Sequence, residues 1–387
     1  MESGQSVIFV ATSAVAFGDI LTYMTQLSRD LEPLYWLFFI GSLLLTQLSG
    51  GRWFWRVNMA VAVLTLCVIL MCLFGSIPNY DMLKYAALPA ESGMDRWFHG
   101  GGMAFMRILP LPCWFYVGTE CVNLSCKNVP RPREQVPWGY VASMTTLFCT
   151  SWAILLCCSS LPPGIETTMY VRNPMRWVFQ QLFHFRERFA AAIALPSLYA
   201  TASGFTYCYS RQFKAMGKSG LINPWFAKSQ PGHKTPVNAL VVGSIASYAM
   251  CFVVNYVPYL GRNQLFNISM LCAISAYASH FVSFAVFQYK FSTIKREFIS
   301  PLGLAGAVYG ILVFFLTFLG ICAFQTDHLA TIVYVVYVLL VVGYYFYAAQ
   351  ERQCFSAEEK TVMFRAYLMK SKGLFSLRQM LSINYIM

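Results

Sequence analysis

One apolar stretch of the sequence, residues 103–125, holds the residues best suited to do chemistry. Pro110 and Pro112 precede the run WFYVGTE, from Trp114 to Glu120, which contains one glycine. Proline removes a backbone donor and glycine tolerates strained dihedral angles, so a helix in this stretch should break or kink. A break within a membrane frees backbone groups that can bind a solute, and transporter substrate sites use such breaks. A kink that serves only helix packing is the alternative interpretation.

The acidic residue of that run, Glu120, favours the first interpretation. An ionisable side chain within a membrane span is costly and by default indicates function. The alternative is that Glu120 lies near the end of its span and reaches water or a neighbouring hydroxyl group. Asp19 raises the same question in the apolar stretch 6–27. Its position in the outer half of that stretch favours contact with water at the membrane surface.

Residues that would build an enzyme active site are scattered. The five histidines lie apart and form no His-Glu-x-x-His motif or metal-ligand pair, and there is no Gly-x-Ser-x-Gly elbow or phosphate loop. Of the thirteen cysteines, all but Cys354 fall within apolar runs, without the spacing of a zinc or redox motif. We expect these cysteines to pack as small apolar side chains, with no disulfide framework. The sequence therefore predicts no enzyme, no metal site and no cofactor.

The composition indicates what kind of structure must position these residues. Hydrophobic residues make up 57% of the chain and charged residues 11%, whereas soluble domains carry roughly 25% charged residues. Most of the surface should therefore face lipid. The formal net charge of +12 does not indicate nucleic-acid binding, because the Lys and Arg residues lie between apolar stretches rather than on a polar domain.

Ten stretches approach or meet the roughly 20 apolar residues that a membrane-spanning helix needs. They run approximately over residues 6–27, 34–49, 54–77, 103–125, 136–161, 189–210, 236–258, 265–289, 301–324 and 329–349. We therefore expect an all-α, polytopic membrane domain over residues 1–349 with about ten transmembrane helices. The loop at 78–102 should be a mobile connection. The tail at 350–387 should be cytoplasmic, and the segment near 361–368 is either an amphipathic helix on the membrane or part of a solvated tail.

The distribution of Lys and Arg predicts the orientation of these helices. One set of alternate loops, together with the tail, holds 19 of these residues, and the other set holds nine. Cytoplasmic loops retain an excess of Lys and Arg. The first set and both termini should therefore be cytoplasmic, in the plasma membrane or an organelle membrane.

Two blocks of the sequence resemble a known family. The block WFYVGTECVNLSCKNVPRPREQVP, from Trp114 to Pro137, resembles the sixth helix and following cytoplasmic loop of amino acid–polyamine–organocation (APC) superfamily permeases. The block from Ser203 to Leu240 resembles that family's eighth helix, its basic loop ending in Lys-Thr-Pro, and the next helix. The ethanolamine and amino acid permease branch is the most similar. The resemblance extends more loosely over residues 1–350.

The resemblance implies an inverted-repeat amino acid permease fold in which residues 103–125 form the sixth helix. Only three predicted spans precede it, so the first two family helices are expected to be absent, including a broken helix that supplies half of the substrate site. The resemblance places the substrate amine or carboxylate against the break. The residues it implies for substrate binding are Trp114, Phe115, Tyr116, Val117, Gly118, Glu120, Ser203 and Gly204. Thr65 and Ser203 are implied as oxygen ligands in ion coupling, with H+ or Na+ as the coupling ion.

These observations predict a secondary active transporter of amino acids or small amines such as ethanolamine, working by alternating access. Its partners would be the small-molecule substrate and the lipid bilayer. The expected absence of two helices favours a second hypothesis. This is a transport-inactive permease homologue that serves as a membrane partner or sensor, or a chain with an incomplete N-terminus.

Overall fold

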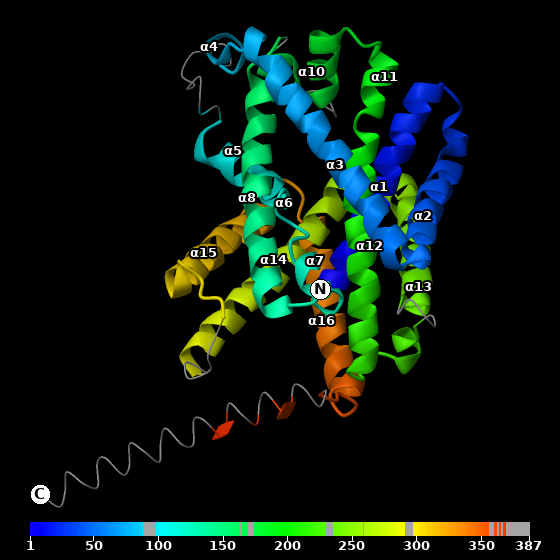
Figure 1. Ribbon diagram of the computed structural model, residues 1–387, viewed down its shortest axis with the longest axis vertical. Coiled ribbons are helices and arrows are strands. Elements are labelled where there is room, and N and C mark those ends of the chain that lie inside the picture. The colour runs from blue at the N-terminus through cyan, green and yellow to red at the C-terminus, as the bar shows by residue number, and fades with distance from the viewer. Residues whose placement is uncertain are drawn as a thin grey trace, which may run out of the picture.

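The computed structural model is an all-helical bundle (Figure 1). The residues that it describes are 1–87, 98, 100–162, 164–168, 174–229, 235–257, 259–290, 297–355, 360, 361, 364, 367 and 368. Within these ranges, nine helices are long and apolar enough to cross a membrane. They are built on α1 (Glu2–Thr25), α2 (Glu32–Ser49), α3 (Gly51–Ser76), α8 (Pro132–Ser159), α12 (Leu195–Lys218), α13 (Val237–Tyr256), α14 (Arg262–Lys290), α15 (Gly303–Cys322) and α16 (Leu329–Tyr344). The predicted all-α, polytopic membrane fold is confirmed.

Helix α1 forms the centre of the packing. It contacts α2, α12, α13 and α14, and apolar side chains such as Phe9, Val10 and Ala14 are buried among them. Small side chains of α13 let the two helices approach closely. The Ser247 hydroxyl donates to the backbone carbonyl of Val7 at 3.1 Å. The middle of α1 is therefore held on several sides.

The outer helices turn large apolar side chains away from the bundle. Trp152 of α8, Phe315 of α15 and Leu340 of α16 are all exposed. Apolar faces of this extent are rare on soluble monomers and suit a hydrocarbon environment. Both the length and the surface of these helices therefore fit a lipid bilayer.

The fourth predicted span, residues 103–125, is not one continuous helix. It is divided into α5 (Gly101–Ile108), α6 (Pro110–Trp114) and α7 (Cys121–Leu124), with turns between α6 and α7 (Figure 1). The predicted break is confirmed. The outer piece is fixed to the end of α15, because Arg107 Nε donates to the carbonyl of Phe324 and Gln325 Nε2 donates to the carbonyl of Arg107, both at 2.9 Å.

Between the fifth and sixth predicted spans, where the sequence predicted only a connection, the described residues include α9 (Ile165–Thr168), α10 (Pro174–Phe183) and α11 (Glu187–Ala192). Helix α10 packs against α3 and α8, and its Val178 and Phe179 join Cys72, Cys157 and Leu161 in a second, smaller core. This cluster closes the end of the bundle that the Lys and Arg distribution predicts to be external.

Two predicted features, the mobile connection and the amphipathic helix of the tail, lie partly outside the described residues. Within the predicted mobile connection 78–102, residues 88–97 and 99 lie outside the described residues, and α4 (Met82–Tyr85) is a short helix in its first part. Most of the tail, with the predicted amphipathic helix near 361–368, also lies outside them.

Candidate functional site

The break in the fourth span arises from local backbone chemistry. Up to Leu109 the helix has ordinary bonds, with the Leu109 amide donating to the Phe105 carbonyl at 2.9 Å. After the two prolines the pattern tightens to the residue three positions back, as when the Val117 amide donates to the Trp114 carbonyl at 3.1 Å. Gly118 then adopts a φ of 101°, which L side chains avoid. The proline pair and this glycine therefore turn the chain before it re-enters a helix at α7.

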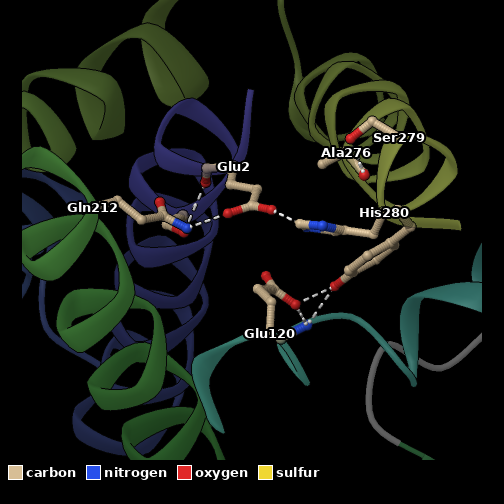
Figure 2. A network of polar contacts seen from close by, with 9 residues as sticks. Glu2, Glu120, Gln212, Ala276, Ser279 and His280 are labelled. Carbon is tan, nitrogen blue, oxygen red and sulfur yellow. Dashed lines mark hydrogen bonds and ion pairs between the residues drawn. The ribbon is translucent and has the colours of Figure 1, made fainter. Parts of the chain in front are cut away.

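The side chain of Glu120 folds back onto this turn. It is only 7% exposed, and its Oε2 accepts from the Gly118 amide at 3.1 Å and from the hydroxyl of Tyr277 on α14 (Figure 2). The same Tyr277 hydroxyl accepts from the Gly118 amide at 3.0 Å. The second oxygen of Glu120, Oε1, is buried and has no hydrogen-bond partner among the described residues. The carboxyl group thus has one oxygen fixed by the protein and one buried oxygen without a partner among the described residues.

A second polar cluster lies beside this carboxyl group. Glu2 lies in the first turn of α1. Its Oε1 is 2.6 Å from His280 Nε2 of α14, and its Oε2 accepts from Gln212 Nε2 of α12 at 2.6 Å (Figure 2). Because Tyr277 and His280 are three residues apart on α14, they lie on the same face of that helix. Three helices therefore bring polar groups to the broken segment.

Gln5 adds two further polar atoms one turn along α1. Its side chain is fully buried and lies beside the Tyr277 hydroxyl, which it approaches as a weak partner. Within the described part of the chain, neither its Oε1 nor its Nε2 meets a partner at good hydrogen-bond geometry. A buried amide without partners is costly, about 1–3 kcal/mol for an unmade hydrogen bond. Such a group suits a site in which a ligand supplies the missing partner.

Sequence reasoning missed Glu2, Gln5, Gln212, Tyr277 and His280. The available signal was spacing: Glu2 with Gln5, and Tyr277 with His280, are pairs three residues apart within or beside apolar segments. That spacing places both members of a pair on one helix face. It could not show that the two faces meet, because the meeting depends on how α1 and α14 pack.

The aromatic residues of the predicted site divide between two surroundings. The ring of Trp114 lies 6.0 Å from that of Phe9 and 6.2 Å from that of Phe266, between α1 and α14. Phe115 is exposed, with its ring 6.4 Å from that of Trp114. The hydroxyl of Tyr116 lies 3.3 Å from Ser151 Oγ of α8. Trp114 therefore contacts side chains of α1 and α14 while 37% of it stays exposed, whereas Tyr116 is directed toward α8.

Among the remaining predicted substrate-binding residues, Val117 packs against the main core and Gly118 lies beside the ring of Phe205 of α12. A Cβ built on Gly118 would lie 3.5 Å from that ring, an ordinary contact. Glycine is therefore favoured at position 118 by its positive φ. A methyl side chain would still find space there. Gly204 is next to Phe205 on α12, and a Cβ there would meet nothing within 4 Å.

Ser203 and Thr65, the predicted ion-coupling residues, have different partners. Ser203 is 1% exposed, and its hydroxyl donates to Asn58 Oδ1 of α3 at 2.7 Å. The Thr65 hydroxyl donates to the carbonyl of Val61 in its own helix at 2.9 Å. The structure thus joins Ser203 to α3 through Asn58, two turns away from Thr65. In the described ranges no three or more His, Cys, Asp or Glu residues are grouped to hold a metal ion.

The expectation that the cysteines only pack was wrong for two of them. Cys121, at the start of α7, forms a disulfide with Cys208 of α12, and their Cα atoms are 5.6 Å apart. The two residues are 87 positions apart in the sequence, so spacing could not reveal the pair. They meet because α7 packs against α12. The disulfide fastens the inner piece of the broken span to that helix.

Comparisons with known proteins support the membrane-transport interpretation. Residues 4–343 match the family described as amino acid permease. An uncharacterized transporter of Rhizobium meliloti (strain 1021) is 23% identical over 210 residues, which cover 52% of this chain. The match covers 42% of that relative, so this chain aligns with less than half of the relative's length.

Proposed function

Because the chain belongs to the amino acid permease family, we propose that it is a secondary active transporter of amino acids or small amines. Its substrate would bind at the break between α6 and α7 and cross by alternating access. The family supports a small-molecule substrate and a lipid bilayer as partners, and a transporter rather than an enzyme.

The observation that carries the proposal is the unpartnered Oε1 of Glu120, buried at a break in a membrane span. A carboxylate oxygen in this position can accept a hydrogen bond from a substrate ammonium group. The amide of Thr119, which donates to no backbone carbonyl among the described residues, can donate to a substrate carboxylate or hydroxyl. An amino acid or an amino alcohol such as ethanolamine carries both kinds of group.

Aromatic rings supply the walls of the proposed site. Phe205 stacks on Phe9 with ring centroids 4.8 Å apart, and the ring centroid of Trp114 lies 6.0 Å from that of Phe9. An ammonium group over such a ring gains about 0.5–2 kcal/mol from cation–π attraction. The site therefore offers both a charge partner and a polarisable wall to an amine.

The moving part in this proposal is α7 with the broken turn. The disulfide joins α7 to α12, so the two would move as one unit against α14 and α1. The hinge on the predicted cytoplasmic side would be the part of Lys127–Pro137 that precedes α8, which begins at Pro132. H+ and Na+ remain the two candidates for the coupling ion, with Ser203 and Thr65 as the proposed oxygen ligands.

The test is uptake by proteoliposomes that contain the purified chain. A panel of labelled amino acids and ethanolamine is offered under imposed H+ or Na+ gradients, and Glu120→Gln is compared with the wild type. This change keeps the shape of the side chain but removes its charge and replaces one of its two acceptor oxygens with an NH2 donor. Glu351→Gln, the same chemical change at an exposed residue, is the matched control.

We expect the wild type to take up at least one panel member faster than empty liposomes do. The uptake rate should fall about tenfold or more in Glu120→Gln, because a hydrogen bond to a charged group is lost. The uptake rate of Glu351→Gln should equal that of the wild type. Unchanged uptake in Glu120→Gln would remove Glu120 from the site. Binding of a panel member without uptake in the wild type would instead support the hypothesis of a transport-inactive sensor.

A further inference from the structure

A cavity of about 870 Å³ opens at the end of the bundle where α1 ends and α14 begins. Its lining includes Asp19 of α1, Ser197 at the start of α12, the segment from Tyr259 to Gln264, and Asp327 before α16. The distribution of Lys and Arg predicts that this end is external. Small-molecule sites in proteins usually enclose about 300–1,000 Å³, so the cavity has the size of a ligand site.

Both signs of charge line this cavity. Arg262 Nη1 forms an ion pair with Asp19 Oδ2, and the two side chains are 36% and 27% exposed. Asp327 Oδ2 accepts from Gln264 Nε2, and its Oδ1 accepts from the Leu329 amide at 2.8 Å. The ion pair and the second carboxylate thus lie at the surface of one hollow, where they remain accessible to a solute.

These groups match the two ends of an amino acid. The guanidinium of Arg262 presents five donors in a planar fork that suits a carboxylate. Arg262 is also the first residue of α14, and the start of a long helix favours negative charge. Asp19 and Asp327 suit an ammonium group. A simple amine would use only the acidic half of this set, and a simple carboxylate only the basic half.

The cavity is separated from the broken turn by aromatic side chains. Trp114 lies against Phe9 and Phe266, at 6.0 and 6.2 Å, and Phe266 is one turn along α14 from Arg262. Asp19 is ten residues from Phe9, about 15 Å along α1. The cavity and the site at Glu120 are therefore distinct places, one on each side of this aromatic contact.

We propose that the cavity is a second binding site, which holds a zwitterionic amino acid by its ammonium group at Asp19 and Asp327 and by its carboxylate at Arg262. The site would load substrate before it passes Trp114 toward Glu120. The loading role rests on the proposed transport function. Binding at the cavity itself does not depend on that function.

The test fills the cavity without straining the backbone. Gly261 lines the cavity, its φ lies outside the left-handed region, and a Cβ there would meet nothing within 4 Å. Gly261→Trp should therefore place an indole in the hollow. Gly343→Trp is the matched control, because Gly343 is exposed on α16 and its Cβ would also meet nothing within 4 Å.

The measurement is equilibrium dialysis of an equimolar mixture of ¹⁴C-labelled L-amino acids against the purified full chain in detergent. Gly261→Trp should bind one equivalent fewer than the wild type, and Gly343→Trp should bind as the wild type does. The loss of one equivalent is expected whether the wild type binds two or, if the site at Glu120 fails, only one. Equal binding by Gly261→Trp and the wild type would overturn the proposal.

A second variant tests the chemistry of recognition. Arg262→Gln keeps a polar side chain but removes the guanidinium, and should weaken amino acid binding at this site about tenfold, the lower value for a hydrogen bond to a charged group. Propylamine and propionate, which each carry one of the two groups, should compete poorly against the labelled mixture. Undiminished binding in Arg262→Gln, or competition by propylamine equal to that by unlabelled amino acids, would overturn the assignment of a zwitterion.

Discussion

The hydroxyl of Tyr277 fixes the carboxyl group of Glu120 to the broken turn, so Tyr277→Phe is a sharp perturbation of the proposed site. The change removes one donor to the buried Oε2 of Glu120 and one acceptor of the Gly118 amide. It keeps the ring, whose centroid lies 5.5 Å from that of Phe314. Packing should therefore persist while one polar contact is lost.

The magnitude follows from the contacts that remain. A hydrogen bond to a charged group is worth about 1.5–3 kcal/mol. Glu120 Oε2 keeps the Gly118 amide as a donor at 3.1 Å, so the lower value applies. About 1.5 kcal/mol corresponds to roughly a tenfold change in a rate or equilibrium constant. We expect a loss of that size in kcat/KM, because the free oxygen of Glu120 would no longer be held toward the substrate.

The assay is the initial rate of uptake by proteoliposomes at a substrate concentration below KM. Tyr334→Phe is the matched control, since it removes a hydroxyl that bonds to Ser275 between α16 and α14 without touching the broken turn. Its uptake should stay within about twofold of the wild type, as expected for a contact outside the site. Equal losses in the two variants would refute the reasoning, because they would show a general effect of loosening α14.

Three further changes test other parts of the account. Gly118→Ala forces an L side chain to φ 101° and should cost about 1–3 kcal/mol in backbone strain. This cost should lower the midpoint of unfolding, whereas the control Gly204→Ala should not lower it. Equal unfolding midpoints in the two variants would show that the turn relaxes freely. Cys208→Ser removes the disulfide to Cys121 and should destabilise by about 2–4 kcal/mol; a chain that unfolds at the same denaturant concentration with and without a reductant would contradict the bond. Thr65→Val removes a proposed oxygen ligand, because the Thr65 hydroxyl donates to the Val61 carbonyl and keeps its lone pairs for a cation. The change should reduce the stimulation of uptake by the coupling-ion gradient; an unchanged stimulation would remove Thr65 from the ion site.

The break in the fourth span could be predicted because it depends on local chemistry. Pro110 and Pro112 act on their own turn of helix and Gly118 on its own dihedral angles, so each effect is visible in the sequence. The spans themselves follow from apolar length for the same reason. These are properties that a segment carries wherever it packs.

The surroundings of the break could not be predicted, because they depend on which helix faces meet. Tyr277 reaches Glu120 only because α14 packs beside the broken span, and Glu2 reaches His280 only through the packing of α1 against α14. The direction of Tyr116 toward α8 has a related cause. Hydrogen bonds to the residue three positions back give about three residues per turn rather than 3.6. This rotates successive side chains away from the faces that a regular helix would give them.

Glu120 and Ser203 differ in whether their polar atoms already have partners within the protein. Glu120 and Gln5 leave buried atoms unpartnered, whereas Ser203 has its hydroxyl donated to Asn58. Ser203 can still accept, so a role in ion binding requires an ion that replaces or joins the Asn58 contact. The structure therefore makes Glu120 the stronger candidate for substrate recognition.

The most direct measurement of the central claim is an experimental structure of the full chain with the compound that the uptake panel identifies. The compound's ammonium group should lie within hydrogen-bond distance of Glu120 Oε1, beside Gly118 and Thr119. A bound compound that leaves Glu120 without contact, and lies only among the outer faces of the bundle, would contradict the claim that the break is the substrate site.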